Sequence, residues 1–354
     1  MSGPNSPPPG SVPLPLIPTP LRERNGSPTE GTGEGWTSDL PPEFALIARH
    51  FKPLAGPGSL NLTDDAAILT PPPNRELVIA ADAMVGGVHF LSDDPADLIA
   101  RKLLRTNLSD LAAMGAEPLG YLMTVSAPAT TPDAWFAAFA AGLAADQKEF
   151  GVTLLGGDTT STPGPVSLSL TILGTVRPGH AIRRTGASAG DAIWVSGTIG
   201  DGALGLLAAT GKLSDPGNTL AGRYRLPRPR IELGKRLHGI ACAGMDVSDG
   251  LVQDLGHICR ASNVAAEIDA AAVPLSDAAR AANMLERCLT GGDDYELLLA
   301  VPPACESQLQ QAAADSGIPV TRIGRFRAGP PHVTVRTADG GEMRLARGGW
   351  SHFT

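Results

Sequence analysis

The sequence has few aromatic residues and no cysteine pairs. The first shortage limits what can fill the cores, and the second argues against a disulfide framework or a zinc site. Aromatic residues make up 4% of the 354 residues, so alanine, leucine and valine must fill most of the cores. No two cysteines form a CxxC pair, which favours buried thiols in a reducing cytoplasm over a disulfide framework or a zinc site. The four are Cys242, Cys259, Cys288 and Cys305.

Positive charge and long apolar runs are scarce too. The 28 lysines and arginines face 36 acids, so the net charge is −8. This balance argues against nucleic acid or an anionic membrane as the main partner. It does not exclude nucleotides, because bound metal ions can reverse the local sign of charge. No apolar run is long enough to cross a bilayer, and the alanine-rich stretch from Trp135 to Ala145 is predicted to be a core helix.

The length and the local composition predict how the chain is divided. At roughly 100–200 residues per domain, two domains are expected. Residues 1–40 differ from the rest, with nine prolines among the first thirty residues and no basic start followed by an apolar stretch. We predict a disordered extension there rather than a secretory signal. The remainder is predicted to divide near residue 180 into an N-terminal domain (41–180) and a C-terminal domain (181–354).

Strand-like and helical patterns mix throughout both parts, so the predicted fold class is α/β or α+β. The longest predicted helix runs from about Pro95 to Met114, begun by proline and ended by Gly115. Further helices are predicted over 44–51, 132–150, 201–210, 228–237, 251–261 and 305–316. Strands are predicted over 66–69, 77–80, 152–155, 166–176, 192–195, 265–268 and 295–300.

Two glycine motifs resemble nucleotide-binding loops but lack their other parts. Gly200, Gly202 and Gly205 match GxGxxG, yet the acid required about twenty residues later is missing from residues 220–225. We therefore interpret these glycines as a tight strand-to-helix turn. Gly211 and Lys212 lack the glycine spacing and the following Ser/Thr of a P-loop, so no P-loop is predicted.

Acidic residues recur at the ends of apolar strands and on helix faces. Each one alone is typical of a turn or a helix N-cap. Glycines flank several of them, as expected where the backbone must approach a ligand closely. Together they predict a shared site. The set is Asp64, Asp65, Asp82, Asp110, Asp158, Asp246, Asp249, Asp293 and Asp294.

Converging carboxylates require cations. Two like charges about 4 Å apart repel by about 4 kcal/mol at an effective dielectric constant near 20. Oxygen ligands favour Mg²⁺, which usually binds together with phosphates. The sequence contains neither a GxSxG elbow nor an evident nucleophile triad. The acids therefore predict a magnesium site that binds phosphates.

Eight motifs, read in order, resemble those of the thiamine-monophosphate kinases, a branch of the aminoimidazole ribonucleotide synthetase-like superfamily. The resemblance covers about residues 42–353. It implies a two-domain fold, a homodimer formed through N-terminal sheets, a C-terminal α/β domain, and ATP binding without a P-loop. The motifs lie at 63–67, 81–90, 107–116, 156–160, 184–186, 246–251, 291–297 and 350–353.

The resemblance also implies the reaction. The γ-phosphoryl group of ATP would pass directly and in line to thiamine monophosphate, with several Mg²⁺ ions, to give thiamine diphosphate in the cytoplasm. The acceptor phosphate oxygen is already ionised at neutral pH, so no general base is required. Catalysis then reduces to positioning and charge neutralisation.

Matched motif by motif, the resemblance gives roles to individual residues. Asp110 and Asp158 would carry the catalytic metal chemistry. The cationic thiazolium of the substrate would gain cation–π attraction from Trp350. The implied metal ligands are Asp65, Asp82, Asp110, Asp158, Asp246 and Asp249. The implied ATP contacts are Gly157, Asp158, Arg184 and Ser248, and the implied substrate contacts are His89, Asp293 and Trp350.

Three departures from the family pattern touch this site. Ala80 and Ala81 stand where the family usually has hydroxyl residues, so only main-chain carbonyls or water could hold metal there. Asp293 replaces the usual glutamate and is one methylene shorter. Thr63 replaces a glycine before the Asp64-Asp65 pair.

Alternative interpretations remain open. The chain could be another ATP-dependent synthetase of the superfamily, although its N-terminal extension has no reactive Cys or Lys motif. It could also be a non-catalytic regulator that binds ATP without turnover. At single positions, Trp350 could merely seal the edge of a core, and His89 could be a satisfied polar residue without a ligand.

Overall fold

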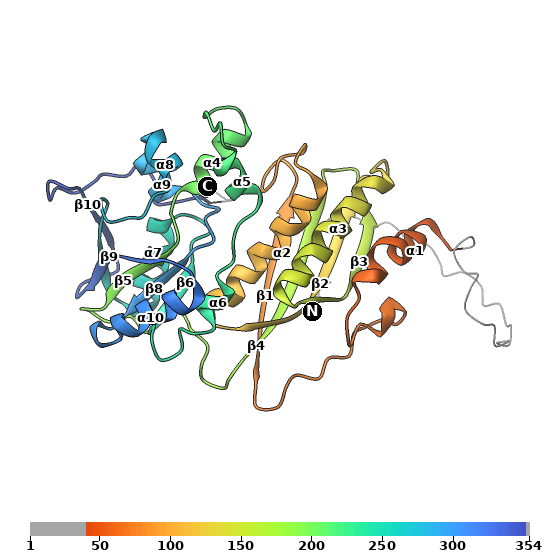
Figure 1. Ribbon diagram of the computed structural model, residues 1–354, viewed down its shortest axis with the longest axis horizontal. Coiled ribbons are helices and arrows are strands. Elements are labelled where there is room, and N and C mark those ends of the chain that lie inside the picture. The colour runs from red at the N-terminus through yellow and green to blue at the C-terminus, as the bar shows by residue number, and fades with distance from the viewer. Residues whose placement is uncertain (1–39, 352–354) are drawn as a thin grey trace, which may run out of the picture. The chain divides into compact units, whose positions relative to one another are not determined.

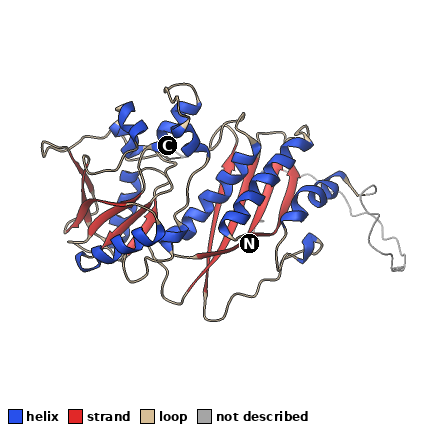
Figure 2. Ribbon diagram, viewed as in Figure 1, coloured by secondary structure: helices blue, strands red, loops and turns tan. Residues whose placement is uncertain are grey.

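The first of two β-sheets is built from residues 76–176 (Figures 1 and 2). A computed structural model describes residues 40–351, so the predicted extension lies outside the described residues except for Leu40. The strand order is β1-β4-β2-β3. Strand β4 pairs antiparallel with β1 and β2, and β3 pairs parallel with β2. The strands are β1 (Glu76–Val85), β2 (Glu117–Ala127), β3 (Thr153–Ser161) and β4 (Ser167–Val176).

Two long helices, α2 (Ala96–Ala113) and α3 (Asp133–Phe150), lie side by side on one face of this sheet (Figure 1). Each begins directly after a proline, whose fixed φ suits the start of a helix. Arg105 of α2 and Asp146 of α3 are buried and form a bidentate ion pair at 2.7 and 2.9 Å. The predicted helices over 95–114 and 132–150 are thus present.

The other face of this sheet carries exposed apolar side chains. Leu77 and Ile79 of β1 are 42% and 61% exposed, and Leu122 of β2 is 39% exposed. Ile79 pairs with Leu173 of β4, whose side chain is half-buried. Because side chains alternate along a strand, the neighbouring Val78 and Met84 point to the helical face and are buried.

The second sheet is six-stranded, in the order β10-β7-β9-β5-β8-β6. Every residue of β5 and β8 is buried, as expected for central strands covered on both faces. One apolar core extends from the first sheet through α2 to β8, and a second surrounds α7. The strands are β5 (Ala192–Ser196), β6 (Ala243–Asp246), β7 (Ala265–Asp269), β8 (Leu297–Val301), β9 (Val320–Arg327) and β10 (Val333–Arg336).

Helices of different lengths accompany the second sheet. The longer two are α7 (Leu251–Ser262) and α10 (Glu306–Ser316). The others are α4 (Asp201–Ala209), α5 (Thr219–Arg225), α6 (Ile231–Gly234), α8 (Asp277–Ala282) and α9 (Leu285–Thr290). The described chain opens with α1 (Pro42–Leu46), which a π-helix continues over Ile47–Phe51. None of the helices within residues 40–351 is both long and apolar enough to cross a membrane.

The mixed α/β class is confirmed, but several element predictions are wrong. Strand β2 was not predicted, because Pro118 and Gly120 interrupt its apolar pattern. Residues 66–69 form no strand, because the Ile68 N–H donates to the carbonyl of Gly58, which lies in a turn and not in a strand. The helix predicted over 228–237 shrinks to α6, because Pro227 and Pro229 prevent an earlier start. The two sheets lie on either side of residue 180, while residues from Pro41 onward form one compact unit, so the domain boundary stays a prediction.

Candidate active site

A cleft of about 490 Å³ lies between residues of the first sheet, helix α2 and loops of the C-terminal half. It gathers eight of the predicted site residues from five separate motifs of the sequence. These are Asp82, His89, Asp110, Asp246, Ser248, Asp249, Asp293 and Trp350. Four others do not line it, namely Asp65, Gly157, Asp158 and Arg184, and their roles stay predictions. Asp65 and Asp158 are exposed, in a bend and on β3 respectively.

Three acids of the cleft lie close enough to shift one another's ionisation. Burial, followed by the charge of Asp246, raises the pKa of Asp110 to about 8. Burial also raises the pKa of Asp246 to about 6, and the charge of Asp82 adds to that shift. The pKa of Asp82 is raised as well, by burial and by Asp249. Arg184 lowers the pKa of Asp110, but less strongly than burial raises it.

Helix α2 positions this group through two other residues of the 107–116 motif. The buried Asn107 side chain accepts a hydrogen bond from the Asp82 N–H at 3.2 Å and so ties β1 to the helix. The Ser109 hydroxyl donates to Asp246 at 2.7 Å. Asn107, Ser109 and Asp110 fall within one turn of the helix; Asp110 lines the cleft, and the buried Asn107 and Ser109 bind the two segments that carry Asp82 and Asp246.

The loop at residues 246–250 is held by an acid that the sequence reasoning missed. One carboxylate oxygen of Asp254 accepts the N–H groups of Ser248, Asp249 and Gly250 at 3.0, 3.1 and 3.2 Å. Asp254 lies in the first turn of α7 and is 1% exposed. An acid in the first turn after a glycine was the available signal, because exposed N–H groups at a helix start attract carboxylates.

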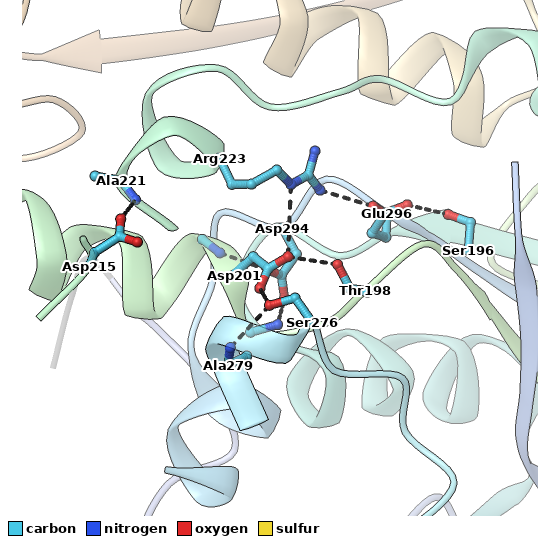
Figure 3. A network of polar contacts seen from close by, with 12 residues as sticks. Ser196, Thr198, Asp201, Asp215, Ala221, Arg223, Ser276, Ala279, Asp294 and Glu296 are labelled. Carbon is cyan, nitrogen blue, oxygen red and sulfur yellow. Dashed lines mark hydrogen bonds and ion pairs between the residues drawn. The ribbon is translucent and has the colours of Figure 1, made fainter. Parts of the chain in front are cut away.

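The Gly-Gly-Asp-Asp-Tyr-Glu segment (291–296) sends successive acids to opposite places. Asp293 lines the cleft, whereas Asp294 is 1% exposed and accepts the N–H groups of Gly200 and Gly202 at 2.7 and 2.9 Å (Figure 3). The GxGxxG glycines therefore bind an internal carboxylate at the start of α4. This explains the dinucleotide-like pattern without a dinucleotide.

Glu296 is the centre of a buried polar network (Figure 3). It is 0% exposed and accepts hydrogen bonds from Ser196 at 2.6 Å and from Arg223 at 3.0 Å. Arg230 binds it through two nitrogens. The nearby Asp201 accepts hydrogen bonds from Thr198 and Ser276 at 2.6 and 2.5 Å. These acids are satisfied entirely by protein groups, so the network stabilises the wall behind the cleft.

His89 and Trp350 are held at the cleft by main-chain contacts. The Val85 N–H donates to His89 Nδ1 at 2.9 Å, so the proton of the neutral ring is on Nε2. The N–H of Trp350 donates to the Asp249 carbonyl at 2.9 Å, and Gln253 donates to the Trp350 carbonyl at 2.6 Å. Trp350 is 54% exposed, so it does not seal a core, whereas its predicted motif partners His352 and Phe353 lie outside the described residues.

Sequence reasoning also missed several cleft residues: Lys102, Arg287 and Arg347 lie outside every motif, and Tyr295 lies inside the 291–297 motif but was given no role. Lys102 and Tyr295 line the cleft beside Asp293, and Arg287 and Arg347 also reach it. Lys102 is 2% exposed although it is a lysine. A lysine on the buried face of a helix was the available signal, since lysine is almost never fully buried without a partner.

The cleft carboxylates suit Mg²⁺ by their chemistry. Within residues 40–351, no three His, Cys, Asp or Glu side chains form a group able to hold a metal ion unaided. Mg²⁺ does not require such a cage, because it usually binds through one or two carboxylates together with waters and substrate phosphates. Buried oxygen donors that raise one another's pKa fit a cation that arrives with phosphates.

Comparisons with known proteins agree on one family. Residues 63–176 match the family model "AIR synthase related protein, N-terminal domain", and residues 188–336 match its C-terminal domain. A thiamine-monophosphate kinase of Caulobacter vibrioides is 45% identical over 322 residues, covering 88% of this chain and 91% of that protein.

Two solved structures are similar as well. A thiamine-monophosphate kinase from Stenotrophomonas maltophilia K279a has a TM-score of 0.73 at 42% identity, covering 80% of this chain and 91% of that one. AaThiL complexed with AMPPCP and TMP has a TM-score of 0.70 at 29% identity, covering 82% and 91%.

Proposed function

The chain belongs to the AIR synthase related family, and from this membership and its similarity to thiamine-monophosphate kinases we propose that it phosphorylates thiamine monophosphate with ATP to give thiamine diphosphate. The observation that carries the proposal is the convergence of Asp82, Asp110 and Asp246 on one cleft that also holds His89 and Asp293. A related structure has been solved with AMPPCP, a non-transferring analogue of ATP, and TMP.

We propose that the phosphoryl group passes directly and in line from ATP to the acceptor phosphate in this cleft. When bound, Mg²⁺ supplies the positive charge that offsets the phosphates of both substrates. Asp82, Asp110 and Asp246 would hold it, with Asp249 at the rim, and Asp65 and Asp158 would serve further ions as the family resemblance implies. Ser109 and Asn107 keep the carboxylates in place, so the residues need not rearrange for catalysis.

The two substrates are proposed to contact different residues. Ser248 in the cleft would contact ATP, and the family resemblance adds Gly157, Asp158 and Arg184, which lie outside the cleft lining. For thiamine monophosphate, Asp293 presents a carboxylate and Trp350 a ring, which suit a cationic thiazolium. His89 would contact the same substrate, as the family resemblance implies. The acceptor phosphate oxygen is already ionised at neutral pH, so it needs no general base.

A homodimer is proposed through the open face of the first sheet. Leu77, Ile79 and Leu122 form an apolar surface there, and a second copy of the chain would cover it. Ile79→Glu should convert the dimer to a monomer in light scattering after size exclusion. Asp277→Asn on the distant helix α8 should not. A wild-type chain that is monomeric at micromolar concentration would contradict the proposal.

The compartment proposed for the enzyme is the cytoplasm. All four cysteines, which lie within the described residues, carry free thiols, as is usual for proteins in a reducing compartment. From the sequence we also propose that the chain divides into two domains near residue 180. We further propose that residues 1–40 are not needed for activity. Deleting residues 1–40 should leave turnover unchanged.

The decisive experiment is to incubate the purified protein with ATP, Mg²⁺ and thiamine monophosphate and to separate the products by chromatography. Thiamine diphosphate should form in step with ADP and disappear when EDTA is added. ATP binding without any thiamine diphosphate would overturn the proposal in favour of a regulator. Product formed from another acceptor would favour a synthetase.

A further inference from the structure

Both carboxylate oxygens of Asp293 have a donor from the protein. The Tyr295 hydroxyl donates to Oδ1 at 3.1 Å, and Lys102 Nζ donates to Oδ2 at 3.4 Å. The two donors come from segments almost two hundred residues apart. All three residues line the cleft, and the Asp293 side chain remains 30% exposed to it.

Lys102 is fixed from several sides. Its ammonium also donates to the His89 carbonyl at 3.0 Å and lies 3.7 Å from the centre of the Tyr224 ring. The Tyr224 hydroxyl donates to the same His89 carbonyl at 3.3 Å. Burial lowers the pKa of Lys102 overall, and the Asp293 charge partly offsets that shift. One buried ammonium thus joins the His89 segment to the Asp293 segment.

The backbone around Asp293 is strained. Asp293 and Tyr295 have φ angles of +71° and +53°, a left-handed conformation that costs energy in residues other than glycine. Main-chain hydrogen bonds hold both, from the Asp293 N–H to the Ser248 carbonyl at 2.9 Å and from the Tyr295 N–H to the Val247 carbonyl at 2.8 Å. Strain of this kind persists only where the surrounding structure fixes it, and it is concentrated at binding sites.

We propose that Lys102 and Tyr295 are positioning residues that hold the Asp293 carboxylate aimed into the cleft, where it receives the cationic part of thiamine monophosphate. The inference rests on the proposed function. Asp293 stands where the family usually has a glutamate, which is one methylene longer. The two donors, Lys102 and Tyr295, fix the direction of the shorter side chain. Burial and the Asp293 charge raise the pKa of Tyr295, so its hydroxyl stays a donor.

The test measures kcat and KM for each substrate in Lys102→Met and Tyr295→Phe. Loss of a hydrogen bond to a charged group costs about 1.5–3 kcal/mol, so the KM for thiamine monophosphate should rise about 10- to 100-fold in Lys102→Met. Tyr295→Phe should raise it by roughly 10-fold. The KM for ATP should stay within about twofold of wild type in both, because neither residue is proposed to contact ATP.

Three controls separate positioning from general stability. Tyr121→Phe removes a hydroxyl that is bound to Gln147 and lies outside the cleft lining, so both KM values should stay unchanged. Lys102→Arg keeps the charge and should recover part of the loss. In a double-mutant cycle with Asp293→Asn, the losses should be strongly non-additive, because both residues act through one carboxylate.

The inference is overturned if the KM for thiamine monophosphate is unchanged in Tyr295→Phe, a variant that lacks only one oxygen atom. It is also overturned if the cycle is additive or if both KM values rise equally. Binding of thiamine monophosphate measured by calorimetry without ATP gives an independent readout. If the wild-type protein binds thiamine monophosphate but forms no product, the proposed function fails. The positioning role of Lys102 and Tyr295 is still tested, by comparing the affinities of the wild type and the variants for thiamine monophosphate.

Discussion

Asp246 in the cleft and Glu296 behind it are both buried acids, but they differ in their partners. Asp246 is 4% exposed and Glu296 is 0% exposed. Glu296 has two arginines and a serine, all supplied by the protein. Figure 3 shows Ser196 and Arg223 of this set. Asp246 has one serine, and its pKa is raised by burial and by the charge of Asp82. A buried acid satisfied by the protein stabilises the fold, whereas one left facing other acids is available for a cation that the fold lacks.

The largest effect should come from the acids of the cleft. We expect Asp110→Asn to lower kcat by about 10³-fold, equivalent to about 4 kcal/mol, because a neutral amide holds Mg²⁺ poorly. The metal-free protein should be as stable as wild type or more stable, since a carboxylate repelled by its neighbours is removed. Steady-state kinetics and urea unfolding measure the two quantities.

Asp277→Asn serves as the matched control for this change. That side chain is 99% exposed on α8, so neither activity nor stability should change. Near-normal turnover in Asp110→Asn would contradict the proposal that the acids in the cleft act in catalysis while the acids behind it stabilise the fold.

The opposite result is expected behind the cleft. Glu296→Ala should lower the free energy of unfolding by about 3 kcal/mol, because Arg223 and Arg230 keep buried charges without a partner. As a control, Glu232→Ala removes an exposed acid that also has two cationic partners, and it should cost about 0.5 kcal/mol. Equal losses in urea unfolding would show that burial does not decide the strength of these pairs.

A smaller loss is expected at the start of α4. Asp294→Asn leaves one acceptor for the N–H groups of Gly200 and Gly202 and turns an amide N–H toward the other. We expect the free energy of unfolding to fall by about 2 kcal/mol. Hydrogen exchange at these two amides should become faster in the variant. Unchanged exchange would mean that the carboxylate does not hold the turn.

The smallest effect concerns metal alone. Mg²⁺ at ten times its dissociation constant should stabilise the protein by about 1.4 kcal/mol, which corresponds to a rise of about 2 °C in Tm. The rise should persist in Glu296→Ala and disappear in Asp110→Asn, as differential scanning fluorimetry can show. A rise of equal size in both variants would place the metal outside the cleft.

Much of the local structure follows from the sequence. Helices α2 and α3 begin at prolines and keep an apolar face, and these signals act within a few residues of one another. The same applies to the 107–116 motif, whose spacing places Asn107, Ser109 and Asp110 on one turn. Eight of the predicted site residues line one cleft. They could be predicted together because the motifs form a set, whereas each acid alone is typical of a turn or a helix N-cap.

The tertiary structure alone decided which acids are paired. Asp293 and Asp294 are neighbours with the same side chain, yet one points to the cleft and the other to α4. No sequence pattern distinguishes them, because their partners, Lys102 and the glycines at 200 and 202, lie about ninety to two hundred residues away. The charge of each acid is set by its side chain, but its pKa, its partner and therefore its role depend on what the fold brings beside it.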